Sequence, residues 1–145
     1  MKESNPMDKF NFLLGRWKME SNIPKSKFSD AYSGNGTGEF KRILNNKYVT
    51  FDYSFDYSKG KGSAHALFVW DNKSNIYRYW WFENSGEHNE ATCDFIDENT
   101  LCLNWHNSLF VQSFKKINSN NILLEMRYPA DKNDYVTVLT VIFRK

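Results

Sequence analysis

The sequence predicts an all-β protein: a closed antiparallel barrel of about ten strands, preceded by a short N-terminal helical turn. Two observations support this fold class. Short segments rich in aromatic and branched residues alternate along the chain with turns rich in Asn, Asp, Gly and Ser. Aromatic residues make up 17% of the chain, and such side chains pack well on a pleated sheet. A meander of this length can form a sandwich or a barrel, and closure into a barrel removes both exposed edges.

The chain is expected to begin with a helical turn over 8–14 and a first strand over 16–23. The apolar residues of the turn stand at helical spacing: Phe10, Leu13 and Leu14. Gly15 lets the backbone bend where a side chain would collide, and Trp17 opens the strand. We therefore expect the turn to plug one end of the barrel, with Trp17 packed beneath the strands that follow.

A polar segment over 24–35 is predicted to be the longest loop, and it ends in a glycine-rich run over 34–38. Glycine-rich loops can cradle a phosphate, but this run lacks the Lys-Ser/Thr pair of a P-loop and precedes a strand. The sequence therefore favours a flexible loop or bulge at the barrel mouth, with phosphate binding as the alternative.

The later strands are separated by polar turns, two of which fall at 58–62 and 129–134. The third strand alternates cleanly, and one face of it carries Val49, Phe51, Tyr53, Phe55 and Tyr57. If the first and last strands pair, Arg144 is expected over the Trp17 ring as a cation–π partner. The strands predicted after the first are 38–44, Tyr48–Tyr57, 63–70, Ile76–Glu83, 88–96, 101–106, a segment running through 117, 122–128 and 135–144.

The composition indicates one domain over 1–145 and argues against several classes of protein. The formal net charge is +2, from 19 basic and 17 acidic residues, so the basic excess typical of nucleic-acid binding is missing. No segment approaches the roughly 18 apolar residues of a membrane span. The first residues lack the apolar core of a signal peptide, which predicts a cytoplasmic protein. Cys93 and Cys102 fall in consecutive strands, where reduced thiols are expected rather than a disulfide or a zinc site.

The motif Leu14-Gly15-Arg16-Trp17 and the ten-strand pattern resemble the calycin superfamily of lipocalins, fatty-acid-binding proteins and nitrobindins. The chain is more closely similar to a bacterial lipocalin-like family of unknown function. That family combines this start with a glycine-bearing second strand, a Tyr/Trp-rich central strand and a Ser-Gly turn, here Gly38, 77–81 and Ser85-Gly86. The resemblance implies a barrel whose central cavity takes a small hydrophobic or amphipathic molecule. Nitrobindin-type haem binding uses a late histidine, and none follows His106, so no cofactor is expected.

The leading hypothesis for function is that such a molecule binds inside the barrel, between alternating aromatic and polar side chains. Clefts of this kind combine an apolar wall with a few polar groups that orient the ligand. The candidate ligand-binding residues, any of which would meet a polar headgroup, are Arg78, Tyr79, Trp81, Trp105 and Arg127.

Two alternative functions remain open. An isomerase, cyclase or hydrolase acting in the same cavity predicts His88 or His106 beside a carboxylate such as Glu90 or Glu125 at the wall. A protein-interaction module instead predicts a filled barrel and a contiguous exposed apolar patch. A homodimer is compatible with each function. The histidines, His65 included, are otherwise expected at the surface or hydrogen-bonded, and no catalytic or metal-binding set is predicted.

Overall fold

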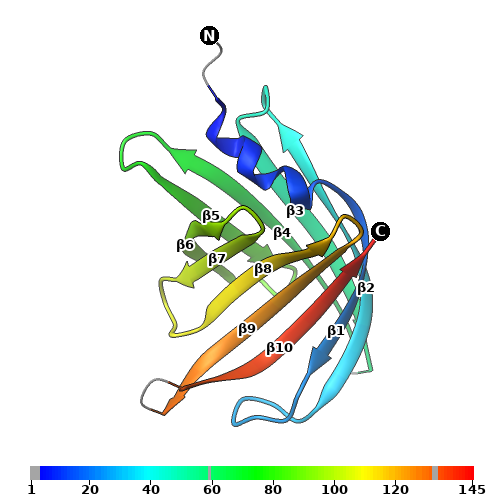
Figure 1. Ribbon diagram of the computed structural model, residues 1–145. Helices are drawn as coiled ribbons and strands as arrows, with labels where there is room; N and C mark the ends of the chain where they lie inside the picture. The colour runs from blue at the N-terminus through cyan, green and yellow to red at the C-terminus, as the bar shows by residue number, and fades with distance from the viewer. Residues whose placement is uncertain (1–3, 59, 132–133) are drawn as a thin grey trace.

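The computed structural model describes residues 4–58, 60–131 and 134–145 and shows a closed barrel of ten antiparallel strands (Figure 1). Each strand pairs with the next in sequence, and the first strand pairs with the last. The predicted fold class is therefore confirmed. The strands are β1 (Gly15–Ile23), β2 (Tyr32–Ile43), β3 (Tyr48–Tyr57), β4 (Gly60–Asp71), β5 (Ile76–Glu83), β6 (His88–Asp97), β7 (Thr100–Trp105), β8 (Val111–Asn118), β9 (Asn121–Asp131) and β10 (Asp134–Arg144).

Parts of three sequence expectations lie outside the described residues. They concern Lys59 in the turn over 58–62, Lys132 and Asn133 in the turn over 129–134, and the first three residues of the segment that was compared with a signal peptide. The described helix is short, and no helix in the described ranges is long and apolar enough to cross a membrane.

β2 begins earlier than the sequence predicts, because the glycine-rich run belongs to the strand. Gly34, Gly36 and Gly38 pair with both β1 and β3, so the run is neither a loop nor a phosphate cradle. The glycines are needed because aromatic rings of β3 lie across β2. A Cβ added at Gly38 would stand 2.8 Å from the Phe51 ring, and one at Gly34 would stand 2.4 Å from the Tyr57 ring. The polar loop is therefore confined to residues 24–31.

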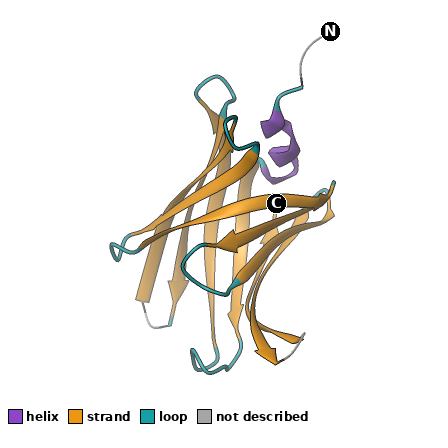
Figure 2. Cartoon of the chain, turned by 90° about the vertical axis from the view of Figure 1, so that its left-hand side faces the viewer, coloured by secondary structure: helices purple, strands orange, loops and turns teal. Residues whose placement is uncertain are grey.

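A 3₁₀ helix, η1 (Pro6–Leu13), lies at one end of the barrel (Figures 1 and 2). Its start is fixed by Asn5, whose side-chain oxygen accepts a hydrogen bond from the Met7 amide at 2.9 Å. The helix buries Met7, Phe10 and Leu13 against the strands, which confirms the predicted plug.

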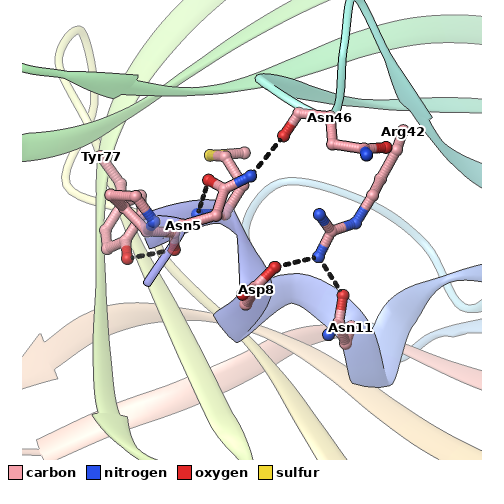
Figure 3. A network of polar contacts seen from close by, with 8 residues as sticks. Asn5, Asp8, Asn11, Arg42, Asn46 and Tyr77 are labelled. Carbon is pink, nitrogen blue, oxygen red and sulfur yellow. Dashed lines mark hydrogen bonds and ion pairs between the residues drawn. The ribbon is translucent and has the colours of Figure 1, made fainter. Parts of the chain in front are cut away.

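Polar contacts hold η1 to the strands around it (Figure 3). The Tyr77 hydroxyl of β5 donates to the Pro6 carbonyl at 2.7 Å, and the Arg42 guanidinium of β2 contacts Asp8 at 2.8 Å and also the Asn11 side chain. In the turn between β2 and β3, the Asn46 backbone carbonyl accepts a hydrogen bond from the side-chain amide of Asn5 at 2.8 Å. These contacts fix the angle at which the helix enters the barrel end.

Trp17 is buried, as expected, and its indole N–H donates to the carbonyl of Leu13, the last residue of η1, at 2.8 Å. The cation over its ring is not the predicted Arg144. Lys145 Nζ lies 4.6 Å from the ring centroid and donates to the Leu14 carbonyl at 3.0 Å. The reason is register: Arg144 stands opposite Lys18 and reaches Glu20 on the outer face at 3.4 Å.

The two cysteines lie on opposite faces of the sheet. Cys93 pairs with Leu103, and Cys102 pairs with Asp94. The register therefore differs by one residue from one that would place the two cysteines opposite each other. Cys93 points into the core and Cys102 points away from it, and both are free thiols, as the sequence suggested. Burial raises the pKa of each thiol, which keeps both protonated and unreactive at neutral pH.

The barrel interior is solid near η1. Stacked and edge-to-face phenylalanine rings fill this half, and Phe40 lies 3.9 Å from Phe51 between ring centroids. The other members of the cluster are Phe68, Phe114 and Phe143. Rings at these separations combine a large buried area with favourable quadrupole contacts. The opposite half of the barrel is hollow.

Candidate functional site

The hollow half contains a cavity with a volume of about 470 Å³. Its walls are largely aromatic: β3 contributes Phe51, Tyr53, Phe55 and Tyr57, and β5 and β7 contribute Tyr79, Trp81 and Trp105. Aliphatic side chains complete the wall, namely Met19, Leu124, Met126, Leu139 and Val141. The interior is therefore not filled, in contrast to the expectation for a protein-interaction module.

The cavity exists because large and small residues face each other across β3 and β4. Phe55 pairs with Gly62, and Tyr53 pairs with Ala64. Both small residues line the cavity, and a Cβ added at Gly62 would meet no atom within 4 Å. Nearer η1 the same two strands carry Phe51 and Phe68, and there the space is filled.

A hydroxyl–indole pair forms one polar feature of the wall. Trp81 Nε1 donates a hydrogen bond to the Tyr53 hydroxyl oxygen at 2.8 Å. The pKa of Tyr53 is raised to about 12, chiefly because the hydroxyl is buried. The hydrogen bond from Trp81 partly offsets this increase, and the Glu83 charge adds to it. The hydroxyl therefore remains protonated at neutral pH, and its hydrogen can be donated to a molecule in the cavity.

Other polar groups of the wall have no protein partner among the described residues. The Trp105 indole nitrogen is buried and makes no hydrogen bond. Gln112 is only 6% exposed, lines the cavity, and makes no side-chain hydrogen bond to any described residue. A buried polar group without a partner costs about 1–3 kcal/mol. The Trp105 nitrogen is closed off from the cavity, whereas the Gln112 side chain lines it and can bond to a polar atom of a ligand.

The turn between β5 and β6 places two carboxylates at the cavity. Glu83 and Glu87 both line it, and the Glu83 amide donates to the Glu87 carbonyl at 2.9 Å, which closes the turn. The Ser85 hydroxyl donates to the Glu83 carboxylate at 2.7 Å. No described Lys, Arg or His lines the cavity.

An aromatic cluster joins the mouth loop (residues 24–31) to β9 and to the connection between β7 and β8. The Phe28 ring lies 5.1 Å from Phe110 and 4.8 Å from Tyr128 between centroids. Lys27 Nζ stands 4.4 Å from the centroid of Tyr128. Because Phe110 lines the cavity, the mouth loop is connected to the cavity wall through one ring.

The structure brings three of the five predicted binding residues to the cavity and excludes two from its wall. Tyr79, Trp81 and Trp105 line it. Arg78 lies on the outer face, where its Nε contacts Asp71 at 2.8 Å, and Arg127 is half-exposed, 3.6 Å from Glu125. The expectation that the arginines face the cavity is therefore corrected: adjacent residues of a strand point to opposite faces, and Arg78 precedes the inward Tyr79.

The histidine–carboxylate pair expected of an enzyme does not lie at the cavity wall. His106 Nδ1 is 3.4 Å from Glu90, whose other oxygen accepts from Trp80 Nε1 at 3.1 Å, and this group lies on the outer face. His88 is exposed, and Glu125 contacts Arg127 outside the cavity. The specific catalytic arrangement that the sequence suggested is thus absent from the described residues of the wall.

Sequence reasoning missed several residues of the site, chiefly Tyr53, Phe55 and Tyr57 of β3, Gln112 of β8, and Glu83. The alternation along β3 was recognised, and it contained the signal for the first three. Gln112 gave no signal, because one buried amide between Val111 and Ser113 has no distinctive spacing. Its role depends on which face of β8 points inward.

A rise in pH is expected to destabilise the protein partly through Tyr53. The unfolded chain loses the hydroxyl proton near the ordinary pKa of 10.0, whereas the folded protein keeps it until about 12. The contribution is therefore fully present below pH 10 and is lost as the pH rises toward 12. At about 1.4 kcal/mol per pKa unit, it amounts to roughly 2–3 kcal/mol.

Urea unfolding at about pH 9 and about pH 11.5 would measure this loss. Tyr53→Phe should lose less stability between the two pH values than the wild type. Tyr135→Phe, at an exposed position, should behave like the wild type. An identical loss in all three proteins would contradict the assignment to Tyr53.

No family model matches the sequence, and no curated protein does. Several solved structures align with this chain, and two of them illustrate the shared fold. Rv2717c from M. tuberculosis aligns with a TM-score of 0.66 and 12% identity over 99% of both chains. The S-type phycobiliprotein lyase CPES from Guillardia theta aligns with a TM-score of 0.64 and 8% identity, over 99% of this chain and 93% of that one. These likenesses concern the fold alone, which is a closed antiparallel barrel of ten strands.

Proposed function

We propose that this protein binds a small hydrophobic or amphipathic molecule in the barrel cavity. The observation that carries the proposal is the aromatic cavity of about 470 Å³, whose wall includes the Tyr53 hydroxyl and the unpartnered Gln112 side chain. A cavity of this volume falls within the usual range for small-molecule sites, which is about 300–1,000 Å³. Side chains fill the half of the barrel near η1, so the open space in the other half is a specific feature of this chain.

The ligand would lie with its apolar body between β3 and the β5–β7 wall, where Phe55, Trp81 and Trp105 line the cavity. A polar atom of the ligand would accept a hydrogen bond from Tyr53 or bond to the Gln112 amide. The Gly15-to-Trp17 start of β1 and the two fold neighbours support placing the chain among lipocalin-like proteins.

A fluorescence titration with N-phenyl-1-naphthylamine, a neutral apolar probe, tests the proposal. The wild type should bind the probe saturably at one site, with enhanced emission. Ala64→Phe fills the cavity from the inner face of β4 and should weaken binding at least about tenfold, or ~1.4 kcal/mol. The probe should be recovered unchanged by mass spectrometry, which distinguishes binding from conversion.

The matched control is Leu67→Phe, a substitution to the same side chain on the outer face of the same strand. Leu67 lies between the inward residues Ala66 and Phe68, so its side chain points away from the cavity. Binding should stay within about twofold of the wild type. Circular dichroism would confirm that both variants are folded. The proposal fails if the wild type shows no saturable binding, or if both folded variants bind the probe equally well.

A further inference from the structure

We propose that the cavity selects a cationic amphiphile: an apolar body enclosed by the aromatic wall and an ammonium group held at Glu83 and Glu87. This inference rests on the proposed function and adds the charge of the ligand to it. It differs from the expectation from the sequence, in which Arg78 and Arg127 were two of the five candidates to meet a polar headgroup. Four observations support it.

The first observation is the sign of the charges at the cavity. Glu83 and Glu87 are its charged lining residues in the described chain, and neither makes an ion pair with a described cation. Glu83 accepts one hydrogen bond, from Ser85, which leaves its second oxygen for a ligand. An ammonium can make charge-assisted hydrogen bonds with both carboxylates.

The second observation is that the two arginines predicted from the sequence, and the lysine of the mouth loop, do not line the cavity. Arg78 contacts Asp71 and Arg127 contacts Glu125, both outside the cavity. Lys27 of the mouth loop stands over the rings of Phe28 and Tyr128, neither of which lines the cavity. A carboxylate ligand such as a fatty acid would therefore be desolvated without a described positive partner, beside two negative charges, which is strongly unfavourable.

The third observation is that the negative potential extends into the wall. Burial is the main cause of the raised pKa of Tyr53 and of Tyr57, and the Glu83 charge adds to both increases. The two hydroxyls thus resist ionisation chiefly because they are buried, and the negative charge of Glu83 adds to that resistance. The same potential would attract a cation and repel an anion.

The fourth observation concerns the neutral part of the wall. The faces of aromatic rings attract cations, and Tyr57 and Trp81 line the cavity together with Glu83. Gln112, which is buried and has no described partner, lies on β8 and is well placed to bond a neutral polar atom of the ligand body. The wall thus offers favourable contacts to a cation and to neutral polar atoms, and none of its charges favours an anion.

Competition among three ten-carbon amphiphiles tests the inference: decylamine, 1-decanol and decanoate, each below its aggregation concentration. They share an alkyl chain and differ in headgroup charge at neutral pH. Each would displace bound N-phenyl-1-naphthylamine from the wild type. We expect decylamine to displace the probe at a concentration at least about tenfold lower than decanoate, with 1-decanol between them.

The double variant Glu83→Gln/Glu87→Gln should reduce the preference for decylamine over decanoate at least about fivefold. The matched control is Glu20→Gln/Glu98→Gln, which removes the same charge from exposed positions that do not line the cavity. It should retain the wild-type preference. A higher salt concentration should weaken the binding of decylamine more than the binding of 1-decanol.

The inference is overturned if decanoate displaces the probe as well as decylamine, if decylamine does not displace it, or if the two double variants behave alike. In each of these cases the probe still binds, so the proposed function stands. If the probe does not bind to the wild type at all, the proposed function fails and the charge preference fails with it.

Discussion

Replacing Gly36 with alanine is expected to destabilise the barrel by about 3 kcal/mol or more, or to prevent folding. A Cβ at this position would stand 2.0 Å from the Ser54 carbonyl oxygen and 2.8 Å from the Phe55 ring. The oxygen belongs to the backbone of the paired strand β3, so it cannot move away without breaking the β2–β3 ladder. The clash is therefore relieved only by separating two strands of the closed barrel.

Urea unfolding followed by circular dichroism measures this effect, with Gly62→Ala as the control. Gly62 pairs with the same Phe55 from the other side of β3, and an added Cβ there meets no atom within 4 Å. Gly62→Ala should be neutral or stabilising by up to about 1 kcal/mol, because alanine restricts the unfolded chain. If the two alanine variants were equally stable, the close approach of β2 and β3 at Gly36 would not be needed for the stability of the barrel.

Phe10→Ala should lower the free energy of unfolding by about 3–5 kcal/mol, because it opens a large cavity inside the η1 plug. The Phe10 side chain is fully buried, and its ring centroid lies 4.9 Å from Phe68, 5.0 Å from Phe95 and 5.3 Å from Tyr77. Those three residues belong to β4, β6 and β5, so one ring joins the helix to three strands.

Phe12→Ala provides the comparison for this prediction, because Phe12 lies on the same helix but is only partly buried. Its ring contacts Phe95 at 6.4 Å between centroids, and its removal should cost about 1 kcal/mol. Chemical denaturation of both variants gives the two values. If Phe10→Ala costs no more than Phe12→Ala, η1 is a peripheral attachment and not part of the core.

The sequence predicted the strand order and most strand positions because alternation is a local property. β3 and β5 were placed with the bounds that the structure shows, and the inward face of β3 was recognised from Val49 to Tyr57. Gly15, which has a φ of 115°, and Trp17 were placed correctly because a sharp bend before an aromatic residue is also local.

The errors come from relations between strands, which one sequence does not reveal. Gly36 looked like part of a loop because glycine is rare in strands, and its purpose depends on the β3 rings that lie across it. Arg144 was expected over the Trp17 ring because the register of β10 against β1 was unknown, and a shift of one residue exchanges the two faces.

The candidate site was predicted only in part for a similar reason. Tyr79 and Trp81 share the inward face of β5, whereas Arg78 between them points outward, so all three could not line one cavity. The hollow itself arises from the pairing of Tyr53 with Ala64 and of Phe55 with Gly62, which requires the β3–β4 register.

The pairing of β1 with β10 also limits how another protein could recognise this one. Many binding domains capture an extended peptide by adding it as a further strand at an open sheet edge. In the described barrel each strand has a neighbour on both sides, so its backbone groups are already engaged. A peptide partner would have to be recognised by outward side chains or by the turns, and its main chain would contribute little to the affinity.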